Sequence, residues 1–153
     1  MDTTSLAAIE EVKNAHFRQI VALVRALEEK YGSGVRDAIA DIPCAQAREK
    51  WAQRAEAKGD HSMDGLLETL WEPLKARGFA FTREDKPDGV QFIVTKCPKA
   101  DLARALDAAD LGFTFFCATD ACLVEGWNDK IGFRRTKTLM EGHEVCDHFY
   151  YWK

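Results

Sequence analysis

The period of the hydrophobic pattern changes about halfway along this chain, and that change restricts the fold more than any other feature. In the first half, apolar residues recur at helical spacing, which is typical of amphipathic helices. After Gly78 they recur at every second position, which is typical of strands. Pro43 is expected to break the second helix. Helices are predicted over residues 5–31, 35–58 and 62–76.

The second half is predicted to alternate strands with short helices. The segment 86–89 (KPDG) has the residues of a turn, because Pro fixes φ and Gly accepts a positive φ. It joins two short strands into a hairpin. Strands are predicted over 79–82, 90–95, 131–139 and 145–152, and helices over 99–109 and 114–126.

This order of elements predicts the α+β class. The N-terminal helices are expected to pack on a roughly four-stranded antiparallel sheet, with two further helices between the strands. One domain is expected over residues 1–153, mainly helical over 1–77 and sheet-containing over 78–153.

Charge and hydropathy exclude several classes of function. The formal net charge of −4 argues against binding to a nucleic-acid backbone, which needs a basic surface. No apolar run approaches the length of a membrane span. The N-terminus lacks the features of a signal peptide, so a cytoplasmic location is expected. A homo-oligomer is compatible with the apolar residues outside the main stripe of the first helix, Val12, Val21 and Leu23, which can equally fill a monomer core.

The chain has five cysteines, and their roles are the main chemical question. An odd number without an export signal argues against a disulfide framework. In a reducing compartment these residues are core thiols, metal ligands or nucleophiles. Cys44, beside Pro43, is expected to be structural, and Cys97 is ambiguous.

Side chains that can perform chemistry concentrate between Cys117 and His148. Residues three apart share a helix face, so Cys117 and Asp120 are expected to point the same way. Cys117 lies near the start of its predicted helix, where the helix dipole would lower the pKa of the thiol. Asp120 is then a candidate acid-base partner. The alternative is that Cys117 is a small core residue.

Residues two apart share a strand face, so Cys146 and His148 are expected to point together. A cysteine with a histidine is the usual pairing for activating a thiol, and both are also metal ligands. Cys146 could equally be a buried strand thiol. His143, in the preceding turn, is expected to be exposed. A three-ligand metal site would need Cys117, Cys146 and a histidine to meet in the folded chain.

Arg134, Arg135 and Lys137 form a short basic run on the third predicted strand. An arginine here could clamp a carboxylate, because its two-pronged donor geometry matches that group. The run could equally be an exposed strand that balances an acidic chain.

An ordered series of short motifs gives the second half a family resemblance. A strand ends in Cys-Pro, a Cys-x-x-Asp pair follows, then an Arg-Thr step and a final Gly-x-x-x-Cys-x-x-Phe. In this chain these are Cys97-Pro98, Cys117 with Asp120, Arg135-Thr136, and Gly142 with Cys146 and Phe149. This series, over roughly 90–151, resembles the L-2-amino-thiazoline-4-carboxylic acid hydrolase family. The last motif is also similar to 4-vinyl-reductase-type domains, which bind small molecules.

The first resemblance implies a hydrolase that opens the ring of a small cyclic amidine. Cys146 would then be the nucleophile or a metal ligand, with Cys117 as its partner. Asp120 would serve as general acid-base or would anchor the amidinium, and His143 is a secondary acid-base candidate. The substrate would be bound by Arg135 at its carboxylate and by Thr136 and His148. The thiol mechanism requires no cofactor, whereas a divalent metal would use Cys117 and Cys146. The second resemblance implies a ligand sensor without turnover.

Overall fold

A computed structural model describes residues 3–153 of the chain. Met1 and Asp2, where the expected domain begins, lie outside the described residues. Three long helices precede the first strand, as the sequence predicted. The helices are α1 (Thr3–Tyr31), α2 (Gly34–Lys58), α3 (Met63–Ala76), α4 (Pro98–Ala105), α5 (Ala109–Gly112) and α6 (Thr119–Trp127), with a π-helical turn η1 (Phe113–Cys117) and a 3-10 turn η2 (Leu139–Glu141). The strands are β1 (Ala80–Lys86), β2 (Gly89–Lys96), β3 (Ile131–Arg134) and β4 (Cys146–Trp152).

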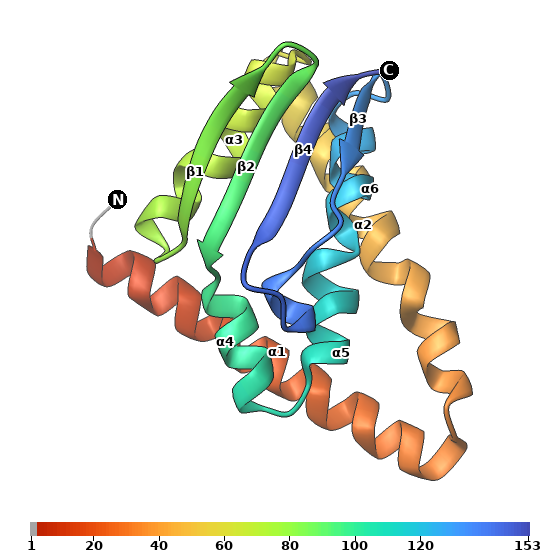
Figure 1. Ribbon diagram of the computed structural model, residues 1–153. Helices are drawn as coiled ribbons and strands as arrows, with labels where there is room; N and C mark the ends of the chain where they lie inside the picture. Colours follow the sequence, from red (N-terminus) through yellow and green to blue (C-terminus); the bar gives the residue numbers. More distant parts are fainter. Residues whose placement is uncertain (1–2) are drawn as a thin grey trace.

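The four strands form one antiparallel sheet in the order β1-β2-β4-β3. β1 and β2 make the hairpin expected from the turn at 86–89. β4, the last strand, inserts between β2 and β3, and Phe92 pairs with His148. In Figure 1 α3 lies behind β1 and β2, whereas α2 and α6 lie behind β3 and β4. The predicted α+β class and four-stranded antiparallel sheet are therefore confirmed.

The third strand is shorter than its hydrophobic pattern indicated. It was predicted over 131–139 but ends at Arg134. The Asp147 side chain on β4 accepts hydrogen bonds from the backbone N–H groups of Thr136 (2.9 Å) and Lys137 (2.6 Å). A carboxylate thus replaces the backbone partners that a continued strand would use. As a result, Arg135 lies just beyond the end of β3, in the segment that joins β3 to β4, and does not pair with a neighbouring strand.

Helices α2 and α6 pack closely and are joined covalently. A Cβ at Gly126 would lie 2.2 Å from the backbone oxygen of Arg48, so only glycine permits this approach. Cys44 on α2 forms a disulfide with Cys122 on α6. The expectation that none of the cysteines pairs is therefore wrong. The expected break at Pro43 is also absent, because α2 continues through it.

The core lies between the helices and one face of the sheet. Alternate residues of β2 supply part of that face, which is why this strand alternates in burial. On β4 the adjacent residues Phe149 and Tyr150 are both buried, so its burial does not alternate. On α1, Val12 and Leu23 are exposed and Val21 is half-buried. No helix among residues 3–153 has the length and apolar character needed to cross a bilayer.

Candidate functional site

A cavity of about 470 Å³ lies between the helices and the core face of the sheet. The helical segments contribute side chains from α1, α2, α3, α4, η1 and α6. Five of the seven site residues expected from the sequence line it: Cys117, Asp120, Arg135, Cys146 and His148. Because these residues come from three separate segments, their convergence is a consequence of the tertiary fold.

Asp120 and Arg135 form an ion pair at this cavity. The side chain of Asp120 is 21% exposed and that of Arg135 is 9% exposed, so the pair is largely removed from water. Arg135 also donates to the backbone oxygen of Cys117 at 3.1 Å, which ties the β3–β4 junction to η1. Burial raises the pKa of Asp120 to about 6, although Arg135 opposes that rise. A carboxyl group with this pKa can exchange a proton near neutral pH.

His148 lies next to this pair on β4. Its Nε2 is 3.3 Å from a guanidinium nitrogen of Arg135 and 3.7 Å from a carboxylate oxygen of Asp120. Burial, reinforced by the charge of Arg135, lowers the pKa of His148 to about 3. The ring is therefore neutral at physiological pH and accepts a hydrogen bond from Arg135 at Nε2. Its Nδ1 then carries the proton and has no partner among the described residues.

The three free thiols, Cys97, Cys117 and Cys146, all line the cavity. The expected lowering of the Cys117 pKa is wrong. Helical turns precede Cys117 on its N-terminal side, so it does not sit at a helix start. Burial and then the charge of Asp120 raise its pKa far above the ordinary value. Burial also raises the pKa values of Cys97 and Cys146. The Cys146 sulfur accepts a hydrogen bond from the backbone N–H of Leu139 at 3.1 Å.

The two remaining expected site residues lie outside the cavity. Thr136 donates its hydroxyl to Asp147 at 2.5 Å, so it belongs to the strand junction. His143 is exposed, and its ring nitrogen lies 3.2 Å from the backbone oxygen of Thr138. Both side chains therefore contact the segment between β3 and β4, and neither lines the cavity.

Lys99 and Trp71 line the cavity and were not singled out from the sequence. Lys99 lies in the first turn of α4, and its ammonium sits 4.0 Å from the ring centre of Phe116. Trp71 on α3 stacks on Phe92, and its indole N–H has no hydrogen-bond partner within residues 3–153. Neither stands out in sequence, because a lysine near a helix start is usually solvated and a tryptophan is usually core.

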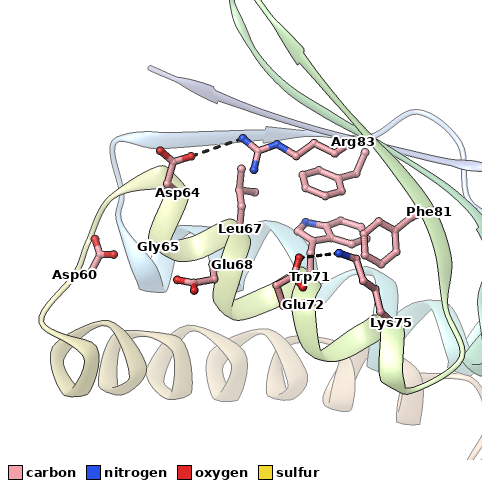
Figure 2. Close-up of a pocket in the computed structure, with 11 residues that line it drawn as sticks. Asp60, Asp64, Gly65, Leu67, Glu68, Trp71, Glu72, Lys75, Phe81 and Arg83 are labelled. Atoms are coloured by element: carbon pink, nitrogen blue, oxygen red, sulfur yellow. Dashed lines mark hydrogen bonds and ion pairs between the residues drawn. The ribbon is translucent and has the colours of Figure 1, made fainter.

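Trp71 also lines a second hollow, of about 510 Å³, between α3 and the β1–β2 hairpin. Figure 2 shows Asp64 of α3 directed to Arg83 of β1, and Glu72 directed to Lys75 along α3. The side chains of these two pairs are 43–90% exposed. The candidate site is therefore the first cavity, where the charged groups are buried.

Comparison with known proteins identifies the family. The family model for L-2-amino-thiazoline-4-carboxylic acid hydrolase matches residues 11–150. The chain belongs to this hydrolase family. The matched range includes every residue of the Asp120–Arg135 pair and the three free thiols, so the cavity is part of the region that defines family membership.

The fold of this hydrolase family member also occurs in a solved sensory domain. The crystal structure of the phenol-responsive sensory domain of the transcription activator PoxR with phenol superimposes with a TM-score of 0.54 at 15% identity. The alignment covers 88% of this chain and 73% of that one. At this identity the likeness shows a shared fold alone. No curated protein matches the chain.

The three-ligand metal site that the sequence left open, made of Cys117, Cys146 and a histidine, is not assembled among the described residues of this member of the hydrolase family. Within residues 3–153 no group of three or more His, Cys, Asp or Glu side chains is placed to hold a metal ion. The cavity holds an ionisable carboxyl group, a neutral imidazole, three free thiols and a buried guanidinium.

Proposed function

We propose that this protein is a hydrolase that opens the ring of a small cyclic amidine, such as 2-amino-thiazoline-4-carboxylate. The observation that carries the proposal is Asp120, a buried carboxyl group with a pKa of about 6, held by Arg135 in one cavity with Cys117 and Cys146. Family membership supports hydrolysis as the reaction class. A cavity of about 470 Å³ is of the size that accepts small molecules.

The reaction adds one water across the amidine carbon. The new carbon–oxygen bond forms as the carbon–sulfur or carbon–nitrogen bond of the ring breaks, and the leaving atom takes a proton. The product is a carbamoylated cysteine with the atoms of the ring plus one water. Asp120, as the carboxylate, takes the proton of the attacking group and returns it to the leaving atom.

A thiol route would use Cys146 as the attacking group. Its sulfur accepts the N–H of Leu139, which favours the thiolate, although burial raises the pKa of the free protein's thiol. A bound amidinium would add a positive charge to the cavity and so favour the thiolate. Cys117, whose pKa is raised by burial and then by the charge of Asp120, would stay a neutral thiol and pack against the ring. Attack by the Cys146 sulfur on the amidine carbon would break the ring carbon–sulfur bond, and the ring sulfur would take the proton that Cys146 gave up, which leaves an isothiourea linked to Cys146. Water would then add to the same carbon and break its bond to Cys146, which regains a proton and releases N-carbamoylcysteine.

The test is turnover of 2-amino-thiazoline-4-carboxylate, followed by mass spectrometry for the gain of one water. Asp120→Asn should reduce turnover about 100-fold or more, because an amide cannot accept and return the proton. Asp129→Asn, at an exposed aspartate in a turn, is the matched control and should retain activity. Cys146→Ala separates the routes: loss of turnover supports thiol attack, and retained turnover supports direct attack by water. Absence of product with the wild-type protein would disprove the proposal for this substrate.

A second candidate is ligand binding without turnover. It is favoured by the raised pKa values of all three free thiols, which leave no resting thiolate in the cavity. The related fold is that of a phenol-responsive sensory domain, so this architecture is compatible with a sensor. A thermal shift by the thiazoline without formation of product would support this candidate over the hydrolase.

A further inference from the structure

The cavity has a strong excess of positive charge although the chain as a whole is acidic. Six cationic side chains line it, whereas Asp120 is the one carboxylate among its lining residues. The whole chain has a formal net charge of −4. The cations are Lys13, Lys50, Arg54, Arg77, Lys99 and Arg135. The proposed substrate is a small carboxylate, and we propose that Lys99, in place of Arg135, binds its carboxylate group.

Arg135 was the residue expected to hold a carboxylate, and its contacts argue against that role. Its guanidinium is committed to Asp120, to the backbone oxygen of Cys117 and to His148. Its positive charge is matched by the buried carboxylate of Asp120. A second carboxylate at the same place would meet the charge of Asp120, which would oppose its binding.

Lys99 is the cation whose charge is left unmatched in the interior of the site. No described carboxylate lies within salt-bridge distance of its ammonium, which rests on the ring of Phe116 at 4.0 Å. Glu10, the acidic group that acts on it most, is paired with Arg77 at 2.7 Å and with Lys13 at 3.1 Å. Burial lowers the pKa of Lys99 to about 8, and Arg77 lowers it further. A ligand carboxylate would stabilise the charged ammonium of Lys99, and so would offset the cost of its burial and its repulsion by Arg77.

Two further cations, Arg54 and Lys50, lie on the α2 side of the cavity and have no acidic partner among the described residues. They extend the positive electrostatic potential of the cavity to that side. Arg54 lies over the ring of Trp51 at 4.8 Å from its centre. Burial and the charges of Arg54, Lys13 and Arg77 lower the pKa of Lys50. Such a field attracts an anion towards the cavity and raises its rate of association. The neighbouring hollow has the opposite character, since it is lined by four carboxylates and two cations.

The remaining walls fit a flat, largely apolar ligand body. Trp71, Phe116 and Tyr150 are among the aromatic residues that line the cavity. The indole N–H of Trp71 and Nδ1 of His148 are buried without partners, so each can bond a polar ring atom of a ligand. A planar ring with a carboxylate at one end therefore fits the site. This inference rests on the proposed function for the identity of the ring, but the anion site can be tested without turnover.

The test measures binding by isothermal titration calorimetry with two ligand pairs. The first pair is 2-amino-thiazoline-4-carboxylate and 2-amino-2-thiazoline, which lacks the carboxylate. The second pair is benzoate and benzamide, which cannot undergo the proposed reaction. Lys99→Met should weaken the carboxylate ligand of each pair about 10- to 100-fold. It should leave the uncharged benzamide nearly unchanged, and it should not weaken 2-amino-2-thiazoline, which is a cation that the Lys99 ammonium repels. Lys96→Met, at an exposed lysine outside the cavity, is the control and should change neither.

Three outcomes would overturn the assignment. These are a wild-type protein that does not prefer benzoate over benzamide, a preference that survives Lys99→Met, and an equal loss of preference in Lys96→Met. A preference that survives Lys99→Met but is lost in Arg135→Met would return the role to Arg135. Lys99→Arg keeps the charge and should retain the preference, which separates loss of charge from loss of packing. If the thiazoline is not turned over while benzoate shows the expected pattern, the proposed reaction fails and the anion site stands.

Discussion

At Asp120, burial and neighbouring charge act in opposite directions on one carboxyl group. Burial raises its pKa, while the charge of Arg135 and its hydrogen bond lower it, and the balance is about 6. Burial of the pair thus produces a proton acceptor suited to neutral pH, a feature common at functional sites. The sequence predicted that Cys117 and Asp120 share a face, because that depends on helical spacing alone. It could not predict the pKa of either residue, because both depend on packing against β4 and Arg135.

The first prediction concerns the pH dependence of the proposed reaction. If Asp120 must be ionised, kcat/KM should fall as the pH drops below about 6. Arg135→Met removes the interactions that lower the pKa of Asp120, so this pKa should rise and the fall in kcat/KM should begin at a higher pH. Arg134→Met, at the exposed neighbouring arginine, should leave the profile in place.

Carbon-13 NMR of the Asp120 carboxyl group gives the same pKa without relying on activity. Circular dichroism of Arg135→Met would check that the fold is retained. An Asp120 pKa near the ordinary aspartate value in the wild-type protein, or one unchanged in Arg135→Met, would contradict the electrostatic account of the site.

At the scale of elements, the junction between β3 and β4 positions the site. The hairpin of β1 and β2 could be predicted because its turn and alternation are local in sequence. The end of β3 could not, because it depends on Asp147, eleven residues beyond Thr136. Burial alone would raise the pKa of Asp147. The hydrogen bonds from Thr136 and Lys137 outweigh that effect and hold this pKa below its usual value. The carboxylate therefore stays ionised as it ends the strand.

Removal of this carboxylate should destabilise the fold. Asp147→Ala leaves the backbone N–H groups of Thr136 and Lys137 without their acceptor, at a cost of about 1–3 kcal/mol in the free energy of unfolding. Because Arg135 directly precedes these residues, its contact with Asp120 should also loosen. Urea unfolding measures the stability loss, and the NMR-detected pKa of Asp120 reports the loosened pair. Glu144→Ala, at an exposed acidic residue, is the control, and equal stability of the two variants would refute the role of Asp147.

At the scale of the whole molecule, the first half of the chain contributes to the site and is linked covalently to the second half, which the family motifs did not indicate. The predicted motifs all lie in the second half, yet Trp71 and Lys50 on α3 and α2 also line the cavity. The helices of the first half were predictable from the periodicity of their apolar residues. Their contribution to the site was not, because a residue that lines a cavity has the same spacing in the sequence as an ordinary core or surface residue of a helix. The Cys44–Cys122 disulfide was missed for a related reason, since its partners are 78 residues apart and only the packing of α2 on α6 brings them together.

The disulfide gives a last prediction, which concerns the stability of the whole fold. Because it links distant segments, it restricts the unfolded chain, so its reduction should lower the free energy of unfolding by about 2–4 kcal/mol. Urea unfolding with and without a thiol reductant measures this loss, and the Cys44→Ser/Cys122→Ser double variant should be insensitive to reductant. Thiol titration of the denatured, unreduced protein should find three free thiols, Cys97, Cys117 and Cys146, rising to five after reduction. Five thiols before reduction would show that α2 and α6 are held by packing alone, and the stability difference should then disappear.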